Sequence, residues 1–63
     1  MIINQKIKKY LEERGITQAF LVTNTGISQE KISNMLNCKR KISADELLKI
    51  CEALKVSADL FLK

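Results

Sequence analysis

The sequence predicts an all-α fold of five short helices, and three observations favour it. The 63 residues include no proline and only two glycines, so few positions interrupt a helix. Apolar residues recur at helical spacing, and no segment alternates with the period of two that marks a strand. A local pattern that is typical of helix starts occurs four times along the chain.

The repeated pattern is an aliphatic residue, then Ser or Thr, then a large apolar residue four positions after the hydroxyl. In each copy the hydroxyl can accept a hydrogen bond from a first-turn N–H, while the aliphatic residue packs on the later apolar one. Ser43 also has Glu46 three residues later, which completes a capping box. The pattern therefore predicts four helix starts. The copies are Ile16-Thr17 with Leu21, Ile27-Ser28 with Ile32, Ile42-Ser43 with Leu47, and Val56-Ser57 with Phe61.

With a first helix placed before these starts, helices are expected at residues 2–14, 18–24, 29–37, 44–54 and 58–62. The first should end at Gly15, because glycine readily takes the left-handed conformation that closes a helix. Within each longer helix the apolar residues share one face, which we expect to be buried. These residues are Ile3, Ile7, Tyr10, Leu11, Leu21, Val22, Ile32, Met35, Leu36, Leu47, Ile50, Cys51 and Leu54.

Length and composition indicate one domain spanning residues 1–63, because so short a chain has room for only one core. No apolar run approaches the roughly 18 residues of a membrane span, and the N-terminus lacks a signal-peptide pattern. We therefore expect a cytoplasmic protein without membrane contact. Two cysteines and no histidine match no metal spacing, so no metal or cofactor is expected. Cys38 should be partly exposed near a loop and Cys51 packed inside, both as reduced thiols.

The charge balance favours a polyanionic partner. Eleven Lys and Arg against seven Asp and Glu give a net charge of +4, although many basic proteins bind no polyanion. The distribution is more informative, because residues 31–41 contain four cations and no acidic residue. We expect this segment to form a locally positive surface.

The second and third expected helices are short and are joined by residues 24–27, which include Gly26. A glycine in so short a connection can turn one helix roughly perpendicular to the next, which is the geometry of a DNA-binding helix-turn-helix. The face of the third helix opposite its apolar stripe carries groups that donate and accept hydrogen bonds. Gln and Asn suit the edge of adenine, and Lys suits guanine. However, any exposed helix face is polar, so this face alone favours neither interpretation. The outward residues are Gln29, Glu30, Lys31, Ser33, Asn34 and Asn37.

From Ile7 to about Phe61 the chain resembles the Cro/phage-repressor (XRE-type) helix-turn-helix family. The resemblance depends on residues 11–18, on residues 26–28 followed by Ile32 and Ser33, and on residues 47–57 with Leu60 and Phe61. It implies a compact, repressor-like fold of five helices whose third helix enters the major groove. It also implies sequence-specific binding of double-stranded DNA by a transcriptional regulator, a repressor that binds a palindromic operator as a dimer.

The resemblance also implies individual contacts. Base contacts are expected from Gln29, Glu30, Lys31 and Asn34. Phosphate contacts are expected from Gln18, Ser28, Ser33, Asn37, Lys39, Arg40 and Lys41, although lysines that follow a helix are often only solvated. Cys38 stands where the family usually has glycine, so the left-handed turn after the third helix should fall on Asn37 or be made another way.

Other functions stay open at this point. The same fold can serve as a protein-interaction module, an antitoxin-like or antirepressor-type regulator that holds a toxin, a polymerase subunit or an antirepressor. Enzyme activity is not expected, because the chain offers no histidine, no Gly-rich phosphate loop and no paired catalytic carboxylates. A weak homodimer would have its seam at Leu60, Phe61 and Leu62. Equally, Leu60 and Phe61 could simply close the core.

Overall fold

Five helices build the fold, and none of the described residues forms a strand. The structure, a computed structural model, describes residues 2–62. The helices are α1 (Ile2–Arg14), α2 (Gln18–Thr25), α3 (Gln29–Leu36), α4 (Ala44–Leu54) and α5 (Asp59–Leu62). The predicted all-α class is confirmed. Compared with the expected ranges, α2 extends one residue further, α3 ends one residue earlier and α5 begins one residue later.

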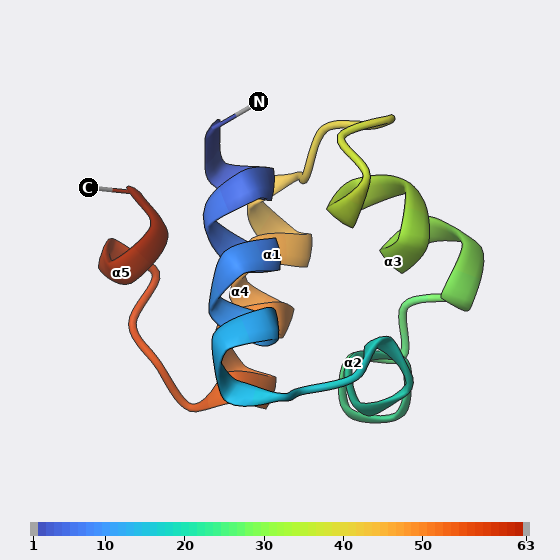
Figure 1. The fold of residues 1–63 in the computed structure, drawn as a ribbon, viewed down its shortest axis with the longest axis horizontal. Helices are drawn as coiled ribbons and strands as arrows, with labels where there is room; N and C mark the ends of the chain where they lie inside the picture. The colour runs from blue at the N-terminus through green and yellow to red at the C-terminus, as the bar shows by residue number, and fades with distance from the viewer. Residues whose placement is uncertain (1, 63) are drawn as a thin grey trace.

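Figure 1 shows the arrangement that places α3 at the surface. The first helix runs through the middle of the view with α4 behind it, α2 and α3 lie to one side, and α5 lies to the other. Contacts of α1 with α3 and with α5, and of α2 with α3 and α4, join the helices. The pair α2 and α3 therefore stands at one side of the molecule, where α3 contacts α1 and α2 contacts α4.

Hydroxyl side chains begin three of the helices as the pattern predicts. Thr17, Ser28 and Ser43 each accept a hydrogen bond from the backbone N–H three residues later, at 3.2–3.3 Å. The capping box is also present, because the Ser43 N–H donates to Glu46 Oε1 at 3.0 Å. Ser57 differs, since its hydroxyl accepts from the N–H only two residues later. The fourth start is therefore a tighter turn before the short α5.

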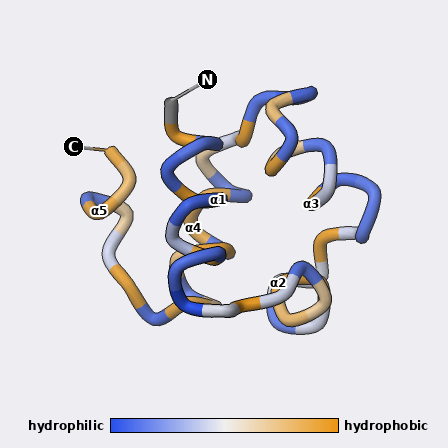
Figure 2. Tube along the Cα trace, in the orientation of Figure 1, coloured by the Kyte–Doolittle hydropathy of each residue, from blue (hydrophilic) through white to orange (hydrophobic). Residues whose placement is uncertain are grey.

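The core draws apolar side chains from all five helices, in keeping with the scattered apolar positions along the tube in Figure 2. The inward stripe predicted for α3 is buried, and Cys51 packs inside as a small apolar residue. Burial of these residues is the main force that holds the helices together. The buried apolar residues are Ile7, Leu11, Leu21, Ile27, Ile32, Met35, Leu36, Leu47, Ile50, Cys51 and Phe61.

The C-terminal helix divides into a core residue and two exposed ones. Phe61 is only 3% exposed and meets the ring of Tyr10 edge to face, with 5.6 Å between ring centroids. Leu60 and Leu62 are 50% and 62% exposed. Phe61 therefore closes the core and is not available to a seam. The alternative in which Leu60 also closes the core is wrong, because half of the Leu60 surface is exposed to solvent.

Two helices end on a left-handed residue that is not glycine. Cys38 after α3 has φ 59° and Lys55 after α4 has φ 58°, whereas α1 and α2 end on Gly15 and Gly26. The left-handed turn after α3 thus falls on Cys38 itself and not on Asn37, whose φ is −91°. A side chain in this conformation is crowded against the backbone, so both positions carry a steric cost.

Replacing Lys55 with glycine is expected to stabilise the domain. The left-handed conformation costs an L-residue roughly 1–2 kcal/mol, and glycine's larger loss of entropy on folding cancels only part of that gain. We expect a net increase of about 0.5–1 kcal/mol in the free energy of unfolding, measured by urea denaturation. Lys49→Gly is the matched control, because Lys49 is exposed within the same helix. It should destabilise by about 1 kcal/mol. If both variants change the free energy of unfolding in the same direction, the steric explanation is contradicted.

Candidate nucleic-acid interface

A short turn joins α2 to α3 and sets the angle between them. Gly26 is left-handed with φ 76°, and its N–H donates to the Val22 carbonyl at 3.1 Å. The hydroxyl of Thr25 donates to the Leu21 carbonyl at 2.5 Å and accepts from the Ile27 N–H at 3.1 Å. Thr25 thus satisfies backbone groups inside the turn. The turn between α2 and α3 is thus short and internally hydrogen-bonded.

The first residues of α2 and α3 are joined by their side chains. Gln29 Nε2 donates to Gln18 Oε1 at 2.7 Å, across 11 residues of sequence. Because the two residues use one group each, Gln29 Oε1 and Gln18 Nε2 keep no protein partner among residues 2–62. The pair presents one acceptor and one donor side by side at the surface. Sequence reasoning selected both residues but did not predict this bond.

The outer face of α3 carries the candidate base-contacting residues. Gln29, Glu30 and Lys31 are exposed, and Asn34 is half-buried, one turn further along. No described residue forms a hydrogen bond with the Asn34 side chain, so its amide keeps both donor and acceptor. These four residues, called the polar strip below, therefore lie on the accessible side of α3.

The candidate phosphate contacts lie at the start of α2, before α3, within it and in the loop that follows it. Ser28 uses its hydroxyl oxygen as the cap of α3, although its hydrogen can still be donated outward. Ser33 accepts a hydrogen bond from Asn37 Nδ2 at 3.4 Å. Lys39 and Lys41 are exposed on the loop that follows α3.

Arg40 differs from the lysines on either side of it. Its Nη2 lies 3.2 Å from Glu46 Oε2, which forms an ion pair between the loop and the first turn of α4. Sequence reasoning grouped Arg40 with Lys39 and Lys41 as a phosphate contact and missed this pair. The capping-box role of Glu46 could be read from the sequence, but no local rule pairs residues six positions apart across a loop. The Arg40 side chain therefore helps to hold the loop against α4.

Glu46 is surrounded by groups that favour its charged form. The backbone N–H of Ser43 has the largest effect and lowers the pKa of Glu46. Burial raises this pKa, whereas the Ser43 hydroxyl and the charges of Arg40 and Lys31 lower it further. The folded pKa thus lies below the ordinary value of 4.5. A carboxylate with a lowered folded pKa stabilises the fold fully above the unfolded value, and that contribution is lost as the pH falls through the folded value.

We therefore expect the wild-type domain to lose stability as the pH falls below 4.5, and Glu46→Gln to weaken this dependence. At neutral pH the variant should be less stable by about 0.5–1 kcal/mol, because glutamine can still cap the helix but cannot pair with the partly exposed Arg40. Thermal unfolding between pH 3 and 7, in steps of about half a unit, measures both effects. Glu52→Gln, at an exposed position of the same helix, is the control. Equal acid sensitivity of Glu46→Gln and wild type would contradict this role.

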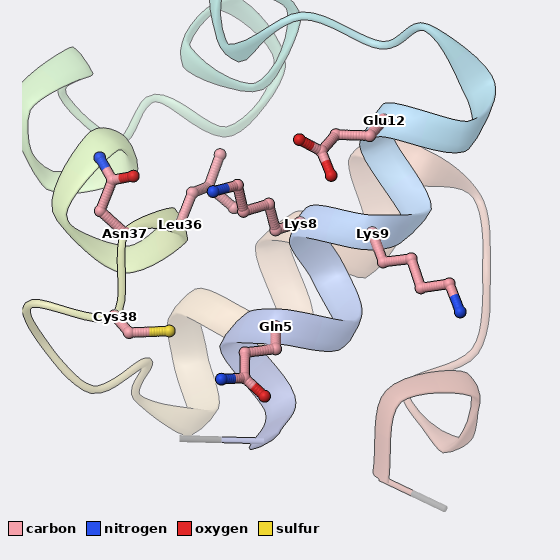
Figure 3. A pocket seen from close by; sticks show the side chains of 7 residues that line it. All are labelled: Gln5, Lys8, Lys9, Glu12, Leu36, Asn37 and Cys38. Atoms are coloured by element: carbon pink, nitrogen blue, oxygen red, sulfur yellow. The ribbon is translucent and has the colours of Figure 1, made fainter.

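A hollow of about 260 Å³ lies between α1 and the end of α3 (Figure 3). A smaller one of about 110 Å³ shares part of its wall and extends to Gln18. Figure 3 shows Lys8 and Glu12 extending from α1 toward α3, while Lys9 points away. Lys8 therefore stands near two candidate phosphate contacts, Gln18 and Asn37, and sequence reasoning did not include it.

Other kinds of site have little support in the described residues. Within residues 2–62 no three His, Cys, Asp or Glu side chains gather as a metal-binding set. Burial raises the pKa of the Cys51 thiol, which keeps it neutral and unreactive. None of the helices in this part of the chain is long and apolar enough to cross a membrane.

Comparison with known families decides the class of this domain. The model of the Cro/C1-type HTH DNA-binding domain family matches residues 6–61. This range includes α2, α3 and α4 in full and most of α1 and α5. The chain belongs to the Cro/C1-type family. The comparisons with curated proteins and with solved structures find no match. The matched residues of this Cro/C1-type DNA-binding domain include α2, α3 and the turn between them.

Proposed function

We propose that this Cro/C1-type domain is a transcriptional repressor that reads a specific sequence of double-stranded DNA with α3 in the major groove. The hydrogen bond between Gln18 and Gln29 carries the proposal most directly. A side chain that is already held in place loses less rotamer freedom on binding, so its contact contributes more to affinity. The exposed Oε1 of Gln29 can accept from the amino group of adenine, while Gln18 Nε2 can donate to a phosphate.

The roles of the other residues follow from their chemistry and position. We assign base contacts to Glu30, Lys31 and Asn34 together with Gln29, because carboxylate, ammonium and amide groups suit cytosine, guanine and adenine respectively. Phosphate contacts are assigned to Ser28, Ser33, Asn37, Lys39 and Lys41 together with Gln18. Arg40 is assigned a weaker phosphate contact, since it must share its guanidinium with Glu46.

We further propose that two copies bind a palindromic site. One module of this size buries too little surface for specific affinity, and paired modules read half-sites about 34–36 Å apart or multiples of that spacing. Leu60 and Leu62 are the candidates for the seam, because both are largely exposed apolar side chains on one short helix. Apolar side chains of this kind gain free energy when a second copy covers them.

Two measurements test the function. Bound sequences are selected from a random duplex pool, and the best duplex and a random duplex are then titrated at several salt concentrations. We expect an enriched palindrome and an affinity for both duplexes that falls steeply with salt, because counterions are released from the phosphates. Salt-independent or undetectable binding would favour the interaction module instead. Sedimentation of the complex tests the dimer separately, since a single copy on the best site contradicts the palindrome and leaves DNA binding intact.

A further inference from the structure

Asn4 on α1 is the one buried polar residue in the described part of the chain, with 1% of its surface exposed. Its Nδ2 donates to the carbonyl of Met35 at 2.7 Å and to the carbonyl of Arg40 at 2.9 Å. Met35 lies in the last turn of α3, and Arg40 lies in the loop that follows. One side-chain amide thus ties α1 to both the end of the recognition helix and the loop.

The orientation of the Asn4 amide follows from these partners. Both are carbonyl oxygens, which only accept, so the NH₂ end of the amide must face them. The Oδ1 end is then buried without a hydrogen-bond partner among residues 2–62. A buried acceptor without a partner opposes folding. General core stability is therefore a poor explanation for an asparagine here.

The loop needs an anchor of this kind because its own turn is an unfavourable one. The turn closes through hydrogen bonds from the Cys38 N–H to Met35 O at 3.2 Å and from the Lys39 N–H to Asn34 O at 2.8 Å. It requires Cys38 to be left-handed, where the α1 and α2 ends use glycine. Beyond Lys39, the loop is held by the Asn4 bond to the Arg40 backbone and by the ion pair of the Arg40 side chain with Glu46.

We propose that Asn4 is a positioning residue for DNA binding, which fixes residues 37–41 against α1 and α3 so that Lys39 and Lys41 stand ready for phosphates. The inference rests on the proposed phosphate role of this loop. Asn4 itself is enclosed by protein and touches no DNA. Its effect is to hold the backbone that carries the two lysines, so that the loop gives up less freedom when it meets the duplex.

The sharpest variant is Asn4→Leu, which keeps a branched side chain and removes both hydrogen bonds. Binding is measured at a temperature where circular dichroism shows that the variant is folded. At 0.1 M salt we expect both the random duplex and the best duplex to be bound about tenfold more weakly for each phosphate contact that the loop loses. The slope of log affinity against log salt should fall by about one unit for each such phosphate. Hydrogen exchange should speed up at the amides of residues 38–41 and not in α4. Should leucine disturb the packing, Asn4→Ala, which adds no volume, is measured in the same way.

The controls separate positioning from stability and from the function itself. Ile50→Val weakens the core in α4, where Ile50 is 1% exposed, and should leave the salt slope unchanged. If folded Asn4→Leu and Asn4→Ala keep the wild-type slope and loop protection while Lys39→Ala and Lys41→Ala lower the slope, Asn4 does not position the loop. If the lysine variants themselves leave the slope unchanged, the phosphate role of the loop is wrong and the positioning proposal falls with it.

Discussion

Phe61→Ala is expected to lower the free energy of unfolding by about 3–5 kcal/mol, which is the usual cost of removing a buried aromatic ring. Phe61 is almost fully enclosed and contributes the edge contact with Tyr10 that attaches α5 to α1. In so small a domain this loss is comparable to the whole stability, so much of the variant should be unfolded at 37 °C. Urea denaturation followed by circular dichroism measures the change.

Leu62→Ala is the matched control, on the same helix but mostly exposed. It should change stability by no more than about 0.5 kcal/mol. If Leu62 contributes to the seam, the same variant should weaken cooperative binding of two copies to a palindromic duplex without affecting binding to a half-site. A near-neutral Phe61→Ala would show that α5 is not part of the cooperative core.

Gln29→Ala and Asn34→Ala are each expected to cost about 1–3 kcal/mol of affinity for the preferred duplex and to relax specificity at one or two base positions. Both side chains are uncharged, lie on the outer strip of α3 and can form paired hydrogen bonds to a base edge. Affinity for random duplex should barely change for Asn34→Ala. Gln29→Ala also removes the bond to Gln18, so its effect includes the loss of a pre-positioned phosphate donor.

Lys39→Ala provides the contrasting result. It should weaken binding to all duplexes alike and lower the slope of log affinity against log salt by about one unit. Arg40→Ala is a less clean comparison, because it also leaves Glu46 without its ion-pair partner. Measurements on the selected duplex and on point variants of it distinguish the two classes of contact. If sequence preference survives in Gln29→Ala and Asn34→Ala but changes in Lys39→Ala, α3 is not the reading element.

The sequence alone predicted the helix starts well because each depends on residues within one turn. A hydroxyl at Thr17, Ser28 or Ser43 bonds to an N–H three residues away, and this relation is the same wherever the helix later packs. The inward stripe of α3 is equally local, since a period of 3.6 residues decides which side chains share a face. The polar strip opposite that stripe followed without knowledge of the tertiary structure.

Only the tertiary structure decided which polar groups the fold itself uses. Asn4 lies on the apolar stripe that continues through Ile7 and Leu11, a spacing that could have marked it as buried, but its partners are more than 30 residues away. The separation of Phe61 from its exposed neighbours likewise depends on where α5 meets α1. Caps and stripes are set by neighbours in sequence, whereas burial, long-range hydrogen bonds and ion pairs are set by which distant segments pack together.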